Sequence, residues 1–191
     1  MRRFSLIAAI FALAACSAPA QTSTWVPDKA HSEVDFSIVH MSLSNVHGRF
    51  GNIAGSIVQN ESDITKSSVN ITIDVTSVDT GVNARDNDLK SARFFDATQF
   101  PTATFASSSV ARSGSGLAVT GNLTLHGVTQ PVVLEVSGPN GPITGMDHKT
   151  HAGYSATATI HRTAFGIGSN IPSAVVGDEV KLSIDLDVVK Q

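Results

Sequence analysis

One stretch of this 191-residue chain interrupts the pattern around it: Asn83-Ala-Arg-Asp-Asn-Asp-Leu-Lys-Ser-Ala-Arg-Phe-Phe-Asp-Ala-Thr-Gln-Phe-Pro101. On both sides of it, apolar and polar residues alternate, which is typical of half-buried strands. Inside it, Ala84, Leu89 and Ala92 predict a short helix over 84–92 with Asn83 as its N-cap. Three phenylalanines follow. We expect a helix across one end of a β-structure, with phenyl rings that either line a pocket or plug a core.

The surrounding alternation predicts about eight strands joined by hairpin-length connections. The clearest strand carries Val180, Leu182, Ile184, Leu186 and Val188 on one face. The chain lacks a βαβ rhythm, which argues against a parallel sheet. Glycines inside two strands, Gly55 and Gly121, are typical of the bulges and bends that close a barrel. We therefore predict an all-β fold, a single antiparallel barrel with one short helix.

Turn residues predict the connections between these strands. Residues 47–51, His-Gly-Arg-Phe-Gly, indicate a bend, and Gly138-Pro-Asn-Gly-Pro142 opens a long loop containing Met146, His148 and His151. Residues 21–24 are polar and predict a tether before a domain that covers 25–191.

The composition limits the function. Apolar residues make up 41% of the chain and charged residues 15%, which excludes a disordered protein. A net charge of −3 provides no basic face for nucleic acid. A barrel of about eight strands has an interior that is either filled by side chains or open to one small ligand. The inward-facing residues are almost all apolar, so an open interior would admit an apolar ligand.

Residues 1–20 have the layout of a secretion signal, with two arginines before an apolar run over 4–15 that is too short to span a bilayer. Leu13-Ala-Ala-Cys16 resembles a bacterial lipobox, in which Cys16 is lipidated. Cleavage after Ala20 also fits, because Ala18-Pro-Ala20 has the small residues that signal peptidase requires. We favour the lipobox, since Cys16 is the only cysteine and follows the apolar run directly.

Either cleavage predicts a mature protein in the periplasm. Lipidation would anchor it to the outer membrane, the default destination for a lipoprotein with Ser17 after the cysteine, and simple cleavage would leave it soluble there. Loss or acylation of Cys16 leaves the domain without a disulfide or a thiol nucleophile.

The remaining polar residues do not predict a metal site, a cofactor or catalysis. His148 and His151 are near neighbours, but only Asp147 accompanies them. His31 precedes Ser32 without the Gly-x-Ser-x-Gly elbow of a hydrolase. The parity of the alternation places His40 on an apolar face.

Several blocks, in order, resemble the YceI-like family of periplasmic polyisoprenoid-binding proteins. They are Asp28-Lys-Ala-His-Ser-Glu-Val-Asp-Phe-Ser-Ile-Val-His40, Val46-His-Gly-Arg-Phe50 with Gly55, the stretch 83–101, Gly121-Asn-Leu-Thr-Leu-His-Gly-Val-Thr129 with Pro131-Val132, Arg162 with Phe165-Gly-Ile167, and Gly177-Asp-Glu-Val180. The resemblance spans the mature domain. The chain departs from the family's usual residues at two positions, with Asp88 in place of a histidine and Ala164 in place of an aspartate.

The resemblance implies a lipocalin-like barrel whose pore holds a long isoprenoid chain, such as a polyprenyl lipid or a quinone tail. With the alternation, it makes these the candidate ligand-binding residues: Phe36, Ile38, His40, Ile71, Ile73, Leu89, Phe94, Phe95, Phe100, Phe105, Leu123, Leu125, Tyr154, Ala156 and Ala158. Polar contacts to a head group are expected from His31, Arg85 and Asp86.

Two functions follow from these observations. The first is a non-enzymatic protein that carries or sequesters an isoprenoid or another long-chain lipid. The alternative is a stress-related envelope module that acts through a protein partner, with a filled core and no physiological lipid. The oligomeric state, a homodimer among the options, is left open by the sequence.

Overall fold

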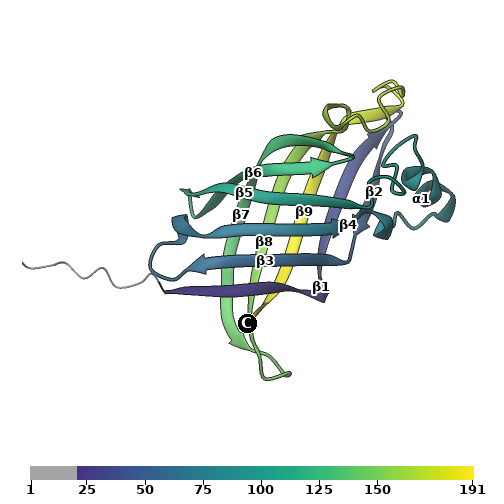
Figure 1. Cartoon of the computed structure of the whole chain (residues 1–191). Coiled ribbons are helices and arrows are strands. Elements are labelled where there is room, and N and C mark those ends of the chain that lie inside the picture. The colour runs from purple at the N-terminus through teal and green to yellow at the C-terminus, as the bar shows by residue number, and fades with distance from the viewer. Residues whose placement is uncertain (1–20) are drawn as a thin grey trace, which may run out of the picture.

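The alternating segments form nine antiparallel strands in a computed structural model that describes residues 21–191 (Figure 1). Residues 1–20, with the predicted signal and Cys16, lie outside the described part. The strands are β1 (Thr22–His40), β2 (Ser44–Phe50), β3 (Ile53–Asn60), β4 (Ser68–Asp74), β5 (Thr102–Ser113), β6 (Gly116–Leu125), β7 (Val128–Thr144), β8 (Thr150–His161) and β9 (Val176–Lys190).

Pairing between the first and last strands closes the sheet into a barrel. Each strand from β3 to β8 pairs with its successor, and β9 pairs with β1 along most of its length. On its other side, β1 pairs with β3 through residues 22–25 and with β2 through residues 34–40. β2 and β3 pair with different parts of the same side of β1, so together they fill one strand position in the ring. Nine strands therefore make eight positions around the barrel. The predicted antiparallel barrel of about eight strands is confirmed.

Three of the predicted connections are wrong. Residues 47–50 belong to β2 rather than to a bend, because they pair with β1 and Phe50 packs against Phe36 with ring centroids 5.5 Å apart. Residues 22–24 begin β1 instead of forming a tether, since they pair with β3. The loop expected from residue 138 begins only after Thr144, because register shifts around Asn140 accommodate the two Gly-Pro pairs within β7.

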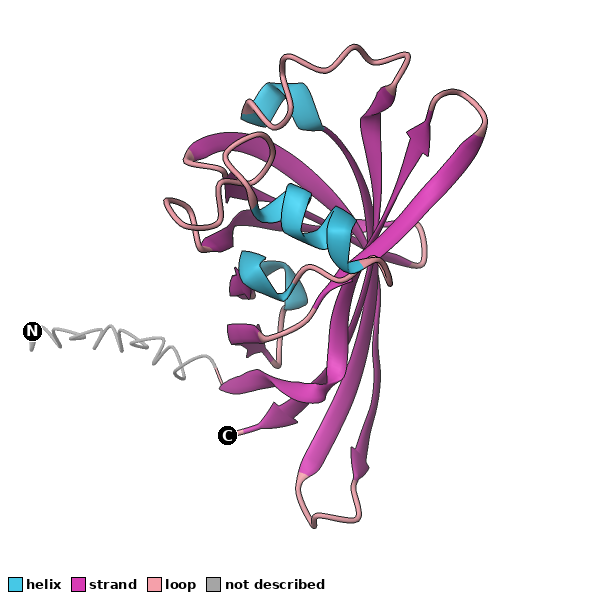
Figure 2. Ribbon diagram, turned by 90° about the vertical axis from the view of Figure 1, so that its right-hand side faces the viewer, coloured by secondary structure: helices cyan, strands magenta, loops and turns pink. Residues whose placement is uncertain are grey.

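The predicted helix is α1 (Asn83–Lys90), which lies with the short helices η2 (Val75–Ser77) and η3 (Arg162–Phe165) at one end of the barrel (Figures 1 and 2). A further short helix, η1 (Ile64–Lys66), joins β3 to β4. None of the helices within 21–191 has the length and apolar character needed to cross a membrane.

The N-cap assignment was wrong, because Val82 holds that position and provides no side-chain hydrogen bond. The entry to α1 is instead fixed by Asp86, a buried carboxylate in the first turn. Its Oδ1 accepts hydrogen bonds from the Thr80 backbone N–H at 2.9 Å and from the Thr80 hydroxyl at 2.5 Å. A carboxylate in this turn also interacts favourably with the helix dipole.

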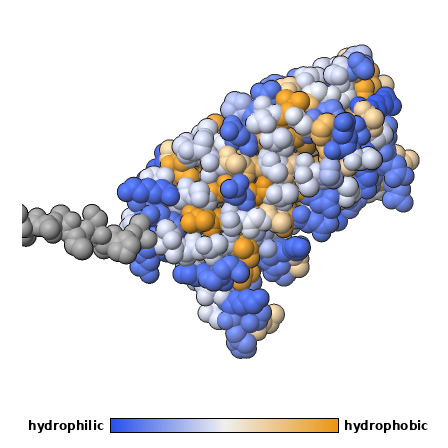
Figure 3. Space-filling view, viewed as in Figure 1, coloured by the Kyte–Doolittle hydropathy of each residue, from blue (hydrophilic) through white to orange (hydrophobic). Residues whose placement is uncertain are grey.

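The inward side chains form apolar clusters at the two ends of the barrel. At the α1 end, Phe94 and Phe165 pack with Val75 and strand residues. At the other end, Trp25, Tyr154 and Val188 pack together, and the Trp25 indole N–H donates to Ser23 Oγ at 2.7 Å. The outer face shown in Figure 3 is mostly hydrophilic, with scattered apolar residues. The barrel is therefore apolar inside and polar outside, as the alternation predicts.

Arg162 organises the segment that follows η3. It is 3% exposed, and its guanidinium donates five hydrogen bonds of 2.5–2.9 Å, all to backbone carbonyls. The acceptors are the carbonyls of Ile167, Gly168, Ile171, Val176 and Gly177. One side chain thus holds the covering segment onto the barrel end.

Arg162→Met is expected to lower the free energy of unfolding by about 3 kcal/mol or more, because five backbone carbonyls, three of them in buried hydrogen bonds, would lose their donor. Chemical denaturation measures the loss. The matched control is Arg112→Met, at an exposed position of β5, which should change stability by less than about 0.5 kcal/mol. Equal effects of the two substitutions would contradict the role given to Arg162.

Candidate functional site

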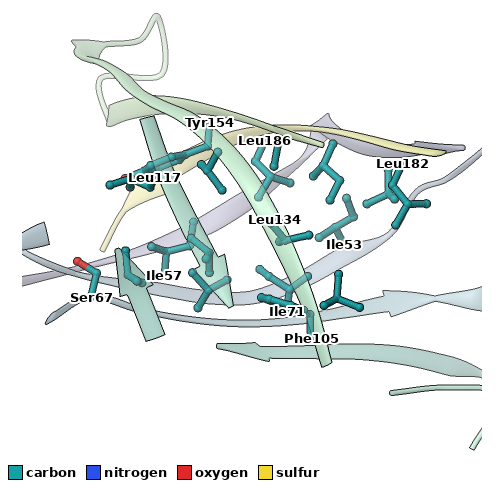
Figure 4. Close-up of a pocket in the computed structure, with 18 of the residues that line it drawn as sticks. Ile53, Ile57, Ser67, Ile71, Phe105, Leu117, Leu134, Tyr154, Leu182 and Leu186 are labelled. Carbon is teal, nitrogen blue, oxygen red and sulfur yellow. The ribbon is translucent and has the colours of Figure 1, made fainter. Parts of the chain in front are cut away.

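The interior of the barrel contains two apolar chambers. The first has a volume of about 130 Å³ and lies toward the η1 end (Figure 4). Every strand of the barrel except β2 contributes to its wall. Its lining residues are Val34, Ile53, Ile57, Gln59, Ile64, Ser67, Val69, Ile71, Ile73, Phe105, Val110, Leu117, Val119, Leu123, Val132, Leu134, Val136, Tyr154, Ala156, Leu182, Ile184 and Leu186.

The second chamber also has a volume of about 130 Å³ and lies beneath α1 and η3. Aromatic rings are concentrated here, and Phe50 meets Phe95 edge to face with centroids 5.5 Å apart. Its lining residues are Val34, Phe36, Ile38, Phe50, Ile73, Val75, Leu89, Phe94, Phe95, Ala103, Leu123, Leu125, Ile160, Arg162, Ile167, Val176, Val180 and Leu182.

Four side chains border both chambers and form what we call the waist: Val34, Ile73, Leu123 and Leu182. They come from β1, β4, β6 and β9, so they are distributed around the barrel wall. All four are branched aliphatic residues. The two chambers therefore follow one another through the barrel and adjoin at this ring of aliphatic side chains.

Neither lining includes a carboxylate, a lysine, a histidine or a cysteine. The ionisable side chains are Tyr154 in the first chamber and Arg162 in the second. The Tyr154 hydroxyl donates to Gln59 Oε1 at 2.9 Å, and burial, reinforced by the charge of Glu61, raises the pKa of Tyr154 to about 12. The donors of Arg162 are occupied by carbonyls, as described above. The chambers thus offer apolar contact with few polar groups.

Most of the predicted ligand-binding residues line a chamber. Ile71, Ile73, Phe105, Leu123, Tyr154 and Ala156 line the first, and Phe36, Ile38, Ile73, Leu89, Phe94, Phe95, Leu123 and Leu125 line the second. The phenyl rings at 94 and 95 therefore line a pocket as well as close the barrel end. Whether these residues contact a ligand stays a prediction.

Three predicted lining residues do not border the chambers. His40 is exposed, because it lies at the very end of β1, beyond the register shift with β9 that follows Ile38. Phe100 packs instead against the His126 ring, with centroids 4.9 Å apart. Ala158 is half-buried beside the apolar cluster at the α1 end, without bordering a chamber.

The expected head-group contacts also lie away from the chambers. Arg85 and Asp86 are both bound to Thr80, with Arg85 Nε donating to the Thr80 hydroxyl at 2.7 Å. His31 is on the outer surface, where its Nδ1 lies 3.0 Å from Asp28 Oδ2. The contact of Arg85 and Asp86 depends on Thr80, which lies outside the family-like blocks, whereas Asp28, the partner of His31, belongs to the first of them.

The two departures from the family pattern lie outside the chambers as well. Asp88 is half-exposed and forms an ion pair with Arg93 at 3.4 Å. At position 164, the alanine carbonyl accepts a hydrogen bond from the Gln130 side chain at 3.1 Å. Neither replacement changes the apolar lining.

Sequence analysis missed much of the first chamber, above all β3 and β7. Ile53 and Ile57 of β3 and Leu134 and Val136 of β7 point inward with the same alternation that identified the other strands. That periodicity was therefore sufficient to find them. Gln59 and Ser67 gave no such signal, because a polar residue near a strand end is more often solvated.

Comparison with known proteins gives a consistent result. The model of the YceI-like domain matches residues 25–188. Protein YceI of Salmonella newport (strain SL254) is 38% identical over 164 residues, which cover 84% of this chain and 83% of that protein.

Solved structures agree with this match. Crystalline BcnA of Burkholderia cenocepacia aligns with a TM-score of 0.72 and 28% identity, over 84% of this chain and 98% of that one. A polyisoprenoid-binding domain from Saccharophagus degradans, implicated in plant cell wall breakdown, shares the fold with a TM-score of 0.63 and 16% identity, over 90% of this chain and all of that one.

The single tyrosine of the chain allows a direct test of the first chamber's polarity. The Tyr154 phenol is expected to ionise near pH 12, against about 10 after unfolding, because the buried phenolate is poorly solvated. The sign follows from proton binding. Between these two pH values the folded state holds the proton that the unfolded state loses, so stability falls as pH rises.

Absorbance of the phenolate after a rapid pH jump, before alkaline unfolding, gives the folded pKa. Denatured protein is the control. A folded midpoint near 10 would contradict a dry chamber around Tyr154.

Proposed function

Because this chain belongs to the YceI-like family, we propose that it is a non-enzymatic binding protein whose two chambers hold the apolar chain of an isoprenoid or another long-chain lipid. The observation that carries the proposal is the arrangement of the chambers. They lie in series through the barrel, are lined by aliphatic and aromatic side chains, and meet at the waist. A slender, branched hydrocarbon matches this shape better than a compact ligand does.

The energetics support a ligand held mainly by its tail. Each buried CH₂ group contributes about 0.8 kcal/mol, so a long chain gains affinity with hardly any polar contact. The Tyr154 hydroxyl already donates to Gln59 Oε1, and the Arg162 guanidinium already donates to backbone carbonyls. Specificity would then depend on the length and width of the two chambers.

The lining also favours binding over chemistry. General acid–base catalysis needs a titratable group with a pKa near the working pH, within hydrogen-bond reach of the reacting atoms. Neither chamber presents a carboxylate, imidazole, amine or thiol. A lipid in the chambers would therefore be surrounded by inert groups.

We further propose that the protein works in the periplasm, anchored to the outer membrane through a lipid on Cys16. The support is the sequence of the N-terminal segment, in which a single cysteine directly follows an apolar run. An anchor there would precede β1 by only a few residues and keep the barrel near the membrane, where long-chain lipids are found.

Ala156→Phe is expected to reduce lipid binding at least tenfold, because its ring would occupy the first chamber. The measurement is the affinity of delipidated protein for solanesol, with mass spectrometry of lipids extracted from the freshly purified protein. Ala106→Phe is the matched control, since it adds the same ring at an exposed position of β5 and should bind as the wild type does.

Two results would contradict the carrier function. One is a freshly purified protein free of lipid that also ignores added prenyl chains, which would favour the envelope module acting through a protein partner. The other is equal binding by Ala156→Phe and wild type, which would place the lipid outside the barrel.

Leu123→Trp tests whether one ligand occupies both chambers. An indole at the waist should weaken binding of the long chain solanesol at least tenfold but leave the short chain farnesol within about threefold, because a short chain need not cross the waist. Titration of both alcohols into the same preparations provides the ratio. Equal losses for the two chain lengths would show that the waist does not lie on the ligand's path.

A further inference from the structure

The seam between β1 and β9 contains an unusual bulge on the outer surface. Pro27 pairs with Val188 and Ser32 pairs with Leu186, so four residues of β1 stand opposite a single residue of β9. That single residue is Asp187. Its backbone carbonyl accepts a hydrogen bond from the Ser32 hydroxyl at 3.0 Å, which fixes the end of the bulge.

The bulge brings Asp28 and His31 against Asp187. His31 Nδ1 lies 3.0 Å from Asp28 Oδ2, and one ligand atom from each of the three residues lies within 4.8 Å of the other two. Within residues 21–191, these three form the one group of histidine and carboxylate side chains that converge in this way. They come from opposite ends of the chain, so the first and last strands must pair to create the group.

We propose that Asp28, His31 and Asp187 bind a divalent transition-metal ion such as Zn²⁺. Imidazole nitrogen and carboxylate oxygen are ordinary zinc ligands at about 2.0–2.2 Å from the metal, and ligands of a tetrahedral ion then stand roughly 3.3 Å apart. The separation of the His31 nitrogen and the Asp28 oxygen is already close to this value. His31 is 70% exposed, so its ring is free to adjust.

His151 and Asp147 extend the group through a chain of hydrogen bonds that ends on Asp187. His151 is only 13% exposed, and its Nδ1 lies 2.8 Å from Asp187 Oδ1 while its Nε2 lies 3.1 Å from Asp147 Oδ1. Hydrogen bonds of this kind hold ligating carboxylates in place in metal sites. With Asp147, the cluster has three carboxylates and two imidazoles, so a net negative charge remains for a cation to offset even if both imidazoles are protonated.

An open groove gives an ion access to the group. The groove has a volume of about 420 Å³ and lies between the barrel wall and the β7–β8 hairpin, which projects beside the C-terminus (Figure 1). His31, His151 and Asp187 line it, together with Asn140 and Ile143 of β7. Tyr154 and Leu186 border both this groove and the first chamber, so they form the wall between the proposed ion site and the interior.

The chain offers a matched control pair elsewhere on its surface. His161 Nδ1 lies 3.0 Å from Asp178 Oδ2, the same separation as in the His31–Asp28 pair. Asp178 is instead engaged by the Thr163 hydroxyl and backbone N–H, and no third ligating residue converges on it among those described. A site that depends on convergence should therefore be lost with His31 and kept without His161.

The test is calorimetric titration of ZnCl₂ into mature protein stripped with EDTA and delipidated. We expect one Zn²⁺ per chain, binding at least tenfold weaker in His31→Ala and in Asp187→Asn, and unchanged binding in His161→Ala. MgCl₂ should give no comparable signal, because Mg²⁺ prefers an all-oxygen shell with several waters.

Thermal unfolding with and without Zn²⁺ provides a second readout. An ion held by Asp28 and His31 of β1 and by Asp187 of β9 would link the two strands and bind only the folded protein. It should therefore raise the Tm of wild type and of His161→Ala but not that of Asp187→Asn. Far-UV circular dichroism shows that each variant is folded. Absence of Zn²⁺ binding, wild-type affinity in Asp187→Asn, or equal losses in His31→Ala and His161→Ala would overturn the proposal.

Discussion

The pairing of β1 with β9 is the constraint on which this structure depends. It joins the two ends of the domain, closes β1 and β3 to β9 into a continuous ring and turns one face of these strands toward a common interior. A strand of nineteen residues is needed, because β1 must pair along β9 on one side and with both β3 and β2 on the other. Closure therefore determines the inner lining, and the same seam assembles the polar cluster outside.

Closure alone does not decide whether a barrel is solid or hollow. Here the aromatic rings gather at the two ends, with Trp25 and Tyr154 at one and Phe94, Phe95 and Phe165 at the other. The wall between them is largely aliphatic, with Ala156 where a larger side chain would reach inward. Two chambers of about 130 Å³ remain. An apolar cavity of this size stays dry in other proteins, so a hydrocarbon is the occupant it favours. The covering segment at the α1 end is held by Arg162 through backbone carbonyls, which leaves the chamber beneath it apolar.

The sequence predicted the parts of the fold that depend on local periodicity. Alternation identified the barrel and most of the lining, and its interruption located α1. It failed where the backbone leaves regular geometry. His40 lies beyond a register shift, and the Gly-Pro pairs of β7 are accommodated by bulges rather than by a loop. The alternation also could not predict contacts between segments that are far apart in the sequence. Thr80 forms hydrogen bonds with both Arg85 and Asp86. Asp28 lies near Asp187 only because β1 pairs with β9.

Lipid binding inside the barrel requires an interior that is hollow, apolar and divided by the waist. The most direct measurement is a crystal structure of the delipidated protein under xenon pressure, because xenon occupies dry apolar cavities without needing polar partners. Xenon should occupy both chambers, on either side of the ring formed by Val34, Ile73, Leu123 and Leu182. An interior filled by its own side chains, with no xenon bound, would contradict lipid binding inside the barrel.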